Sequence, residues 1–470
     1  MKIKDITLNT KFLYTILAIA VYTILTICYL RQVNVDEREH LYSSFMVYRG
    51  ELPYRDFFQH HHPLIWYLFA PFLIFFNNTP YIWYVMRTFN IVFLFLSSYY
   101  ISKITYDITK NKSTSIITSI IYFGFINIQT SGVEFRPDNL MMLFFISGLY
   151  YLLLYLNNNS PSKLLTSYIL FLLSFLSLQK IIPLLFGVFI IILCHIKNNP
   201  KKTNEILSYL IFPSTLFLTF IAYLYYNDAL KDYFELCYLL NTKIKVTYSI
   251  VPISNYIVPI ISVIFSLYNL KTSSSSSLKI ISFLYILQFI VTIIHSPYPQ
   301  YLLMLYPFIS ILLSNFLYNL KKPLLTLATI IFVLYQYLYI LHFFINYNGL
   351  SLKGYIDLSK AVITYSSPSD IIINDQLHVG GLRKSAYGYY WYGHDALSLL
   401  DYRIFKRHPW PNLMQIIHQK RPKLIANSAQ RICLNNQNEI IKDCFSLSKP
   451  TLDDLPSNYI ESELMFLRID

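Results

Sequence analysis

Long runs of apolar residues recur along this chain, and short polar stretches separate them. About 20 consecutive apolar residues in a helix span the hydrocarbon core of a bilayer. On that criterion the pattern predicts about 11 transmembrane helices, at residues 11–30, 81–101, 114–130, 138–156, 164–178, 181–196, 204–226, 252–269, 279–295, 300–319 and 324–347. The chain is therefore predicted to be a polytopic α-helical membrane protein.

Two apolar runs do not fit a single straight span. The run 63–76 has only 14 residues and contains Pro71, which predicts an interfacial or re-entrant helix. The run 164–196 has 33 residues, and one helix of that length measures about 50 Å, against about 30 Å of hydrocarbon. It must turn, and Gln179-Lys180 is the polar place for the turn. Lys180 is then either a solvated loop lysine or a site residue.

Lysine residues gather in every second loop between the predicted helices, as is typical of cytoplasmic loops. They are Lys2, Lys4, Lys103, Lys110, Lys112, Lys163, Lys197, Lys201, Lys202, Lys271, Lys279, Lys321 and Lys322. The other loops, 31–80, 131–137, 179–180, 227–251 and 296–299, mix cations with carboxylates and are predicted on the outer face. We therefore expect a membrane protein with a cytoplasmic N-terminus and, because 11 is odd, a tail on the outer face. This bias also explains the net charge of +13 without a nucleic-acid partner.

The composition changes at about residue 350. After a membrane domain over 1–349 we expect a small α/β domain over 350–470 on the outer face. Short apolar runs at 370–374, 422–426 and 463–468 predict strands, and 411–419 predicts a helix. Cys433 and Cys444 lie close together in the tail, and an oxidising compartment favours a disulfide between them over two free thiols.

Ionisable residues from distant parts of the chain converge on the predicted outer face. The first polar segment, 31–62, contributes Asp36, Glu37, Arg55, Asp56, His60, His61 and His62, and later loops contribute Glu134, Arg136, Asp138, Lys180, Tyr298, Gln300 and Tyr301. A single charge at a membrane edge is most often simply solvated. A set of ionisable residues close to span ends marks a substrate pathway, and we expect the chemistry here.

These residue types suit group transfer from a phosphate leaving group to a hydroxyl. A carboxylate can accept the proton of an alcohol, and arginine, lysine or histidine can neutralise a phosphate. The sequence contains neither G-x-x-x-x-G-K-[ST] nor G-x-G-x-x-G, the loops that bind nucleotide phosphates. A donor anchored in lipid fits a site at the bilayer surface.

The motifs of the first polar segment resemble those of the bacterial GT-C membrane glycosyltransferases. They are an Asp-Glu pair after the first predicted helix, then Gly50-x-x-Pro53-Tyr54-Arg55-Asp56-Phe57-Phe58, then His61-His62-Pro63-Leu64. The group includes the aminoarabinose transferase of lipid A, the protein O-mannosyltransferases and lipopolysaccharide-core sugar transferases. Arg136-Pro137-Asp138 and Tyr298-Pro-Gln-Tyr301 are similar to later motifs of the group, and the resemblance covers about residues 10–345.

The resemblance implies a GT-C-like fold, a polyprenyl-phosphate sugar as donor, an envelope glycan, lipid or protein as acceptor, and inversion at the anomeric carbon. It also implies the inner membrane of a bacterium, with the C-terminal domain in the periplasm. By match to the family motif, Asp36 would be the catalytic base, supported by Glu37. The donor phosphate would contact His61 or His62 with Arg55, Arg136 or Lys180, and the substrate-binding residues would be Asp56, Asp138, Tyr298, Gln300 and Tyr301. The aminoarabinose transferase has a lysine before Pro-Pro-Leu, where this chain has His61 and His62.

Three alternatives remain. In an extended segment His60 and His62 share a face, and with a carboxylate they could ligate a divalent metal ion; we rank this below phosphate contact, and no other cofactor is indicated. A lipid or glycan transporter (flippase) is the rival from another class, although transporters place ionisable residues near the bilayer midplane and the predicted spans are nearly free of charge. A polysaccharide polymerase or ligase is a related enzyme.

Overall fold

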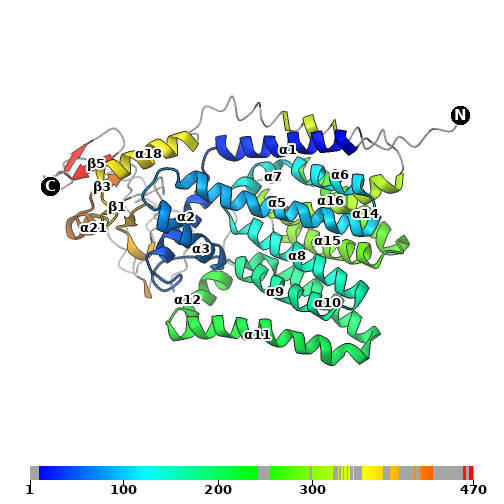
Figure 1. The fold of residues 1–470 in the computed structure, drawn as a ribbon. Coiled ribbons are helices and arrows are strands. Elements are labelled where there is room, and N and C mark those ends of the chain that lie inside the picture. Colours follow the sequence, from blue (N-terminus) through cyan, green and yellow to red (C-terminus); the bar gives the residue numbers. More distant parts are fainter. Residues whose placement is uncertain are drawn as a thin grey trace. The chain divides into compact units, whose positions relative to one another are not determined.

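The computed structural model describes residues 10–241, 254–295, 299–320, 352–373, 382–390, 407–408, 413–426, 459–461 and 465–468, together with single positions between 327 and 342. Figure 1 shows the elements that these residues form. The predicted span at 324–347 falls mostly outside the described residues, and Tyr298, Cys433 and Cys444 fall outside them entirely. The contact of Tyr298 and the disulfide therefore stay predictions.

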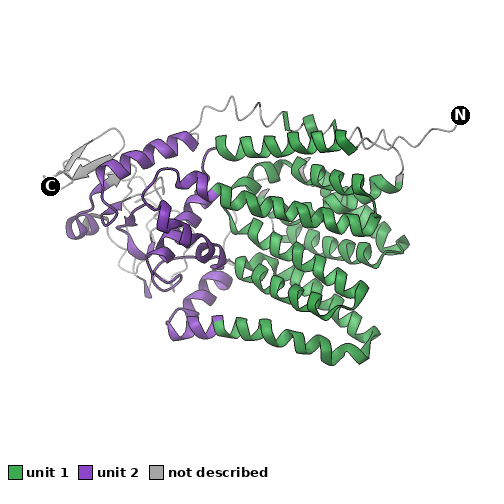
Figure 2. Cartoon of the chain, in the orientation of Figure 1, with its two compact units in different colours: residues 1–31, 87–219, 246–348 green, residues 32–86, 220–245, 349–470 purple. Residues whose placement is uncertain are grey.

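The chain forms two compact units (Figure 2). Unit 1 comprises Met1–Arg31, Arg87–Thr219 and Val246–Asn348, and unit 2 comprises Gln32–Met86, Phe220–Lys245 and Gly349–Asp470. Unit 2 thus collects the first polar segment, the polar segment before residue 245 and the C-terminal tail. These are the three longest segments that the charge pattern predicts on the outer face.

Unit 1 is built from helices joined by short turns. They are α1 (Thr10–Leu30), α5 (Ile82–Thr109, which begins in unit 2), α6 (Lys112–Gly124), α7 (Ile126–Gln129), η2 (Ser131–Val133), α8 (Pro137–Asn158), α9 (Pro161–Ser177), η3 (Gln179–Ile181), α10 (Ile182–Asn198), η4 (Pro200–Lys202), α11 (Thr203–Tyr226, which ends in unit 2), α14 (Ser254–Thr272), α15 (Ser276–His295), η6 (Pro299–Met304) and α16 (Tyr306–Leu320). Among the described residues six helices are long and apolar enough to cross a bilayer, or seven if the bent pair α6–α7 is one span. The multi-pass helical fold is confirmed, and the number of about 11 spans stays a prediction.

Local sequence sets the helix ends of unit 1. α8 begins at Pro137, where the missing N–H costs no helical hydrogen bond, and it is followed by Asn159 in the left-handed conformation, at φ 52°. Asparagine tolerates this conformation better than most residues. Pro161 then begins α9. The 3₁₀ turn η3 separates α9 from α10, so the predicted turn at Lys180 is confirmed.

Two predicted spans, 114–130 and 300–319, are not continuous straight α-helices. The first bends by 68° between α6 and α7. α6 ends at Gly124, a poor helix former, and the methyl groups of Val333 lie 2.6 and 2.9 Å from where a Cβ of residue 124 would stand. The second span starts as the 3₁₀ helix η6, and its α-helix begins only at Tyr306.

Small and hydroxyl-bearing residues bring α8 and α9 together. A Cβ on Gly148 would lie 2.9 Å from the ring of Phe171, so the close approach needs glycine. Ser167 donates a hydrogen bond to the carbonyl oxygen of Gly148 at 2.9 Å, and Ser174 donates to that of Met141 at 2.8 Å. Lipid tails are as apolar as the helix faces, so close packing and such hydrogen bonds hold membrane helices together.

Unit 2 combines short helices with a small sheet. Its helices are α2 (Val35–Tyr48), α3 (Leu64–Phe69), η1 (Ala70–Phe72), α4 (Leu73–Phe76), α12 (Leu230–Phe234), the π-helix η5 (Glu235–Leu240), α18 (Leu352–Tyr365), η7 (Gly388–Tyr390) and α21 (Leu413–Lys420), and its strands are β1 (Ile371–Ile373), β2 (Lys384–Ser385), β3 (Leu424–Ala426), β4 (Tyr459–Glu461) and β5 (Met465–Arg468). The run 63–76 is helical as predicted, with Pro71 in the 3₁₀ turn between α3 and α4.

The polar segment 31–62, predicted as a loop, contains the helix α2. The side chain of Asn34 accepts a hydrogen bond from the backbone N–H of Asp36, and the carboxylate of Glu37 accepts one from the backbone N–H of Asn34 at 2.9 Å. This capping box starts the helix. The sequence of α2, VDEREHLYSSFMVY, has no apolar run, so the hydrophobic pattern did not reveal it.

The five strands form one sheet in the order β2-β1-β3-β5-β4. β1 is parallel to β2 and β3, with Ile372 opposite both Ser385 and Leu424, and β5 is antiparallel to β3 and β4. The predicted strands at 370–374, 422–426 and 463–468 are confirmed as β1, β3 and β5, and the predicted helix at 411–419 is α21. The tail therefore carries an α/β sheet as expected, while the domain boundary near residue 350 and its periplasmic side stay predictions.

Ion pairs join the tail to the segment around α12 within unit 2. Arg407 donates to Asp232 at 2.8 Å and also pairs with Glu235, and His408 Nε2 lies 3.0 Å from the carboxylate of Asp232. Burial raises the pKa of Asp232, but the hydrogen bonds and charges of His408 and Arg407 outweigh it, so the pKa lies below the ordinary 3.8. The ionised form of Asp232 thus stabilises unit 2.

We predict that this network weakens in acid. Folding lowers the pKa of Asp232, so its stabilising contribution is present above the unfolded-state pKa and is lost as the pH falls through the lower folded-state pKa. Thermal unfolding in detergent, followed by intrinsic fluorescence, should show a wild-type midpoint that drops between about pH 5 and about pH 3. Asp232→Asn should start lower at neutral pH and depend less on pH.

Asp357→Asn is the matched control, because its ion pair with Lys360 is exposed on α18. It should follow the wild-type curve. A pH profile of Asp232→Asn that superimposes on wild type would contradict the role of this carboxylate.

Candidate functional site

A continuous series of ion pairs lies within unit 1. Arg31, directly after α1, pairs with Glu134 at 2.6 Å. Arg136 pairs with Glu134 at 3.6 Å and with Asp138 at 3.3 Å. Lys180 pairs with Asp138 at 3.6 Å. These five residues, from Arg31 to Lys180, are called the ionic series below.

Breaks between helices supply the residues of the ionic series. Glu134 and Arg136 have extended backbone between η2 and α8, and Asp138 stands in the first turn of α8. The partial positive charge of a helix N-terminus favours a carboxylate at such a position. Lys180 comes from η3, the turn between α9 and α10. The turns that end the helices therefore place alternating charges next to one another.

The ionic series is buried at its carboxylates and more open at its ends. The side chains of Glu134 and Asp138 are 1% and 2% exposed, and those of Arg31 and Lys180 are 17% exposed. A buried ion costs several kcal/mol unless it is paired, and the alternation of sign meets this need. Three cations face two carboxylates, and this positive excess suits an anionic ligand such as a phosphate.

Arg87 and Tyr301 extend the series on either side. Arg87 on α5 is fully buried and donates to the carbonyl oxygens of Cys28 and Arg31 at 2.6 and 2.7 Å, which holds the C-terminal end of α1 where Arg31 begins the series. Lys180 Nζ lies 4.3 Å from the ring centroid of Tyr301 on η6, a cation–π distance. Arg31 and Arg87 were not among the predicted site residues. The signal for Arg31 is a cation directly after the first span, whereas Arg87 is a cation inside the predicted span 81–101.

The predicted site residues of unit 1 thus fall into one place. Arg136, Asp138, Lys180 and Tyr301 are connected through the ionic series, and Gln300 is the neighbour of Tyr301 in η6. The predicted residues of unit 2 are spread over three places: the start of α2, the histidines after Gln59, and the turn at Arg55 and Asp56.

Asp36 and Glu37 stand in the first turn of α2 and have different surroundings. Asp36 is half-buried, whereas Glu37 is fully buried and closes the capping box with Asn34. The helix N-terminus favours a negative charge on both. Glu37 therefore fixes the start of α2, and Asp36 is the carboxylate of the pair with more access to solvent.

The three histidines after Gln59 have separate partners. His60 and His61 have ring centroids 4.0 Å apart, and their ring nitrogens lie with a carboxylate oxygen of Glu39 in one group. His62 is buried, and its Nε2 lies 3.1 Å from the hydroxyls of both Tyr233 and Tyr238. The expectation that His60 and His62 share a face is wrong, because the backbone here is irregular and not extended in a strand.

Arg55 and Asp56 pair with each other at a surface turn. Arg55 Nε and a carboxylate oxygen of Asp56 are 2.8 Å apart, and the backbone N–H of Leu52 donates to Asp56 at 2.7 Å. Burial raises the pKa of Asp56, but these hydrogen bonds outweigh it and the pKa is lowered. The turn also contains Tyr54 at φ 74°, so this pair has a clear part in holding the turn.

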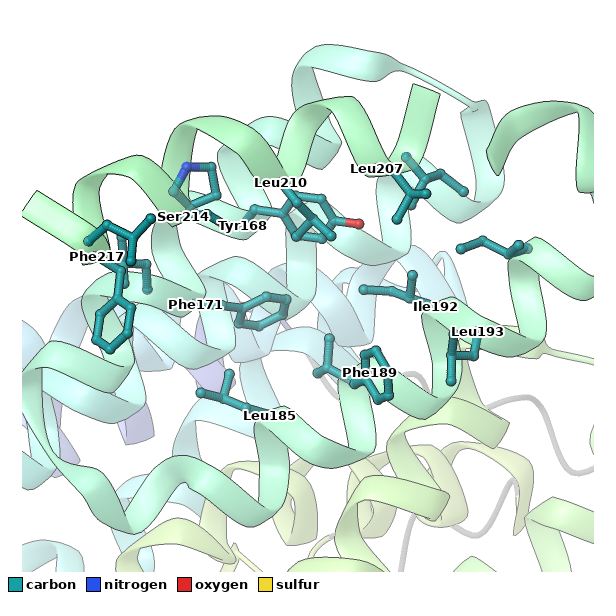
Figure 3. A pocket seen from close by; sticks show the side chains of 16 residues that line it. Tyr168, Phe171, Leu185, Phe189, Ile192, Leu193, Leu207, Leu210, Ser214 and Phe217 are labelled. Atoms are coloured by element: carbon teal, nitrogen blue, oxygen red, sulfur yellow. The ribbon is translucent and has the colours of Figure 1, made fainter. Parts of the chain in front are cut away.

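An apolar cavity lies between α9, α10 and α11 (Figure 3). Its volume is about 530 Å³, and its lining includes Phe171, Leu185, Phe189 and Phe217, which Figure 3 shows turned toward a common space. The lining contains no ionisable acid or base other than the phenol of Tyr168. The cavity suits hydrocarbon and has no group for catalysis, so the chemistry belongs to the polar clusters.

We predict that the ionic series stabilises unit 1. Asp138→Asn removes one carboxylate and leaves buried Arg136 with less compensation, a change that costs about 3 kcal/mol in buried pairs. Asp107→Asn is the control, because the pair of Asp107 with Lys110 is exposed and such pairs contribute about 0–1 kcal/mol. The midpoint of thermal unfolding in detergent should drop clearly for Asp138→Asn and little for Asp107→Asn. Equal midpoints for the two variants would contradict the prediction.

Two comparisons with known proteins bear on this arrangement. Residues 60–226 match the family model described as dolichyl-phosphate-mannose-protein mannosyltransferase. The chain also superimposes on the crystal structure of ArnT from Cupriavidus metallidurans bound to undecaprenyl phosphate, with a TM-score of 0.64 and 9% sequence identity over 94% of this chain and 100% of that one. No curated protein matches the chain by sequence.

At 9% identity the likeness to ArnT carries the fold alone. The family match covers His60, His61, His62, Arg136, Asp138 and Lys180 and ends before the tail. The first polar segment predicted a resemblance to one group of membrane enzymes, and residues 60–226 match a family model of that group. The resemblance is therefore confirmed for this part of the chain, and the chain has the multi-pass helical fold of the ArnT structure.

Proposed function

We propose that this protein transfers a sugar from a polyprenyl-phosphate donor to a hydroxyl group of an envelope glycan, lipid or protein, with inversion of the anomeric carbon, on the periplasmic face of a bacterial inner membrane. The observation that carries the proposal is the ionic series of unit 1, where three cations meet two carboxylates. A site of this kind attracts an anion that stays near the membrane. The phosphate of a lipid-linked sugar has both properties.

The donor phosphate is held by Arg136 and Lys180, with Arg31 at the other end of the series. An ammonium carries three N–H donors and a guanidinium five, so both cations can bind their carboxylates and a phosphate at once. As the bond between the anomeric carbon and the phosphate oxygen breaks, negative charge grows on the phosphate. Cations already in position stabilise that charge without rearranging.

Asp36 is the catalytic base in this proposal. The acceptor hydroxyl attacks the anomeric carbon from the face opposite the phosphate, its proton passes to Asp36, and the phosphate leaves on its lipid. One such displacement inverts the anomeric centre. Asp36 suits the task because it is half-buried and ends a helix cap that fixes its backbone, while Glu37 is committed to that cap. Glu37 is therefore a positioning residue.

The remaining predicted residues have supporting parts. His61 contributes to the phosphate contact, and His62, which packs with Tyr233 and Tyr238, positions its neighbour. Burial raises the pKa of Tyr238 to about 12, so its hydroxyl stays protonated. Tyr301 contacts Lys180 and keeps the ammonium beside the phosphate. Arg55 is a further candidate for the phosphate contact. Asp56, Asp138, Tyr298 and Gln300, with Tyr301, form the proposed substrate-binding set.

The position of the charges also favours an enzyme over a transporter. In the described long helices Asp138, Glu205 and Lys279 stand in the first turns and Lys197 in the last turn. Arg87 stands in the second turn of α5, where it donates to the carbonyl oxygens of Cys28 and Arg31. A transporter is expected to place ionisable groups near the bilayer midplane. Movement of labelled donor across proteoliposomes without any transfer of sugar would favour the transporter instead.

We predict that Asp36→Asn abolishes transfer. Loss of a general base costs about 100-fold or more in kcat, and asparagine keeps the shape of the side chain and leaves the cap of α2 in place. The measurement is transfer of a radiolabelled sugar from a polyprenyl-phosphate donor to membrane glycans and proteins by the purified full-length chain in detergent.

Asp357→Asn is the control, because that carboxylate is exposed and far along the chain in α18. It should keep wild-type transfer, and both variants should elute as wild type in size-exclusion chromatography. Undiminished transfer by Asp36→Asn would overturn the assignment of the base.

A further inference from the structure

Unit 2 contains a second polar cluster, in which one residue, His61, is also proposed to contact the donor phosphate. Glu39 on α2 and the two histidines His60 and His61 each offer one ligand atom, and these atoms all lie within 4.8 Å of one another. We propose that Glu39, His60 and His61 bind a divalent transition-metal ion of the Zn²⁺ type. The three residues are called the Glu39 site below.

The distances within the Glu39 site fit a shared ion better than a direct ion pair. His60 Nδ1 is 3.8 Å from the carboxylate of Glu39, which is too long for a hydrogen bond. Two ligands that each stand about 2.0–2.2 Å from Zn²⁺ can be up to about 4.3 Å apart. The separation of His60 and Glu39 lies inside that limit, and all three ligand atoms lie within 4.8 Å of one another.

Hydrogen bonds from outside the cluster hold the carboxylate in place. The amide of Gln59 donates to Glu39 at 2.9 Å and to Ser43 Oγ at 2.8 Å. Ser43 in turn donates to the backbone carbonyl of Glu39 at 2.9 Å. Partners of this kind around a ligand orient it toward the metal and typically change metal affinity 10- to 100-fold when removed. Gln59 and Ser43 therefore act as positioning residues for Glu39.

The backbone of the two histidines is held as firmly. The carbonyl oxygen of His60 accepts a hydrogen bond from the side chain of Asn241 at 3.0 Å, and that of His61 accepts one from the hydroxyl of Tyr54 at 2.8 Å. Irregular backbone with both carbonyls bonded in this way lets neighbouring imidazoles lie on the same side. Adjacent histidines, which are not a usual zinc spacing, can therefore both serve as ligands here.

Burial of the Glu39 carboxylate favours the binding of a cation beside it. The side chain of Glu39 is 5% exposed and that of His60 is 11% exposed. A carboxylate taken out of water needs a compensating charge as well as hydrogen bonds. Two imidazoles and one carboxylate form the donor set of several zinc enzymes, in which three protein ligands leave the fourth position to water. The Glu39 site thus has the composition of an open zinc site.

The test measures metal directly and does not depend on activity. The full-length protein is purified in detergent with an affinity tag that contains no histidine, stripped with chelator, exposed to Zn²⁺ and analysed by elemental mass spectrometry. We expect one tightly bound Zn²⁺ per chain. Substitution by Co²⁺ should give visible d–d absorption bands with the intensity of a four- or five-coordinate site. Wild-type protein that retains no metal would overturn the proposal.

Zn²⁺ binding by single-residue variants tests whether the ion occupies the Glu39 site. His60→Ala, His61→Ala and Glu39→Gln should each weaken Zn²⁺ binding at least tenfold, and Gln59→Ala should weaken it about 10- to 100-fold. His418→Ala removes an exposed histidine on α21 and should bind as wild type. Full affinity in all three ligand variants would exclude the Glu39 site.

Two further measurements keep the result clear if a ligand variant folds poorly. Glu39→Asp retains a carboxylate and should recover part of the binding. Zn²⁺ should also raise the thermal midpoint of wild type, because a ligand that binds only the folded state stabilises it, and it should leave the midpoint of Glu39→Gln unchanged. An equal shift in both proteins would place the ion elsewhere and contradict the proposal.

Discussion

A charge buried at the edge of a membrane must be paired, and this constraint organises unit 1. Glu134 and Asp138 are almost completely buried, and each lies between two cations. The cost of desolvating these ions is met by alternation of sign along the ionic series. The breaks between helices allow the series to form. α8 begins at Pro137, next to Asp138, and the long apolar run breaks at Lys180. The ion pairs reduce the cost of burying these charges. Because the cations outnumber the carboxylates, the series also keeps a net positive charge that can attract an anion.

In unit 2, hydrogen bonds from side chains and from the tail stabilise a segment of irregular backbone. The segment after Phe58 has little regular structure, and side chains donate hydrogen bonds to its carbonyl groups. Nearby Tyr54 donates to His61, and Asn241, which is distant in sequence, donates to His60. Tail residues add to this, since the N–H of Phe58 donates to the carbonyl oxygen of Tyr389 at 2.9 Å. A backbone braced in this way can present adjacent histidines in one direction, and this feature is what makes a metal site conceivable.

The sequence predicted the features that depend on length and local pattern. The turn at Lys180 followed because 33 apolar residues exceed the bilayer, and β1 followed from a short run of isoleucines in a polar tail. The sequence did not predict features that depend on long-range strand pairing or on hydrogen bonds from side chains. α2 has no apolar run and depends on the capping box of Asn34 and Glu37, and β2 has only two residues and exists because β1 lies beside it. The partnership of Arg31 with Glu134, and of Glu39 with the histidines, joins residues that no local pattern connects.

The central claim is that the carboxylate of Asp36 faces the water on the outer side of the membrane, where a lipid-linked donor and its acceptor can meet. Labelling of single cysteines in intact cells with a membrane-impermeant maleimide tests it most directly. Gln32 and Lys201 are both exposed, and they are predicted on opposite faces. The account predicts that Gln32→Cys reacts from outside in intact cells and that Lys201→Cys reacts only after the membrane is permeabilised. The reverse pattern, with position 32 protected until permeabilisation, would contradict the account.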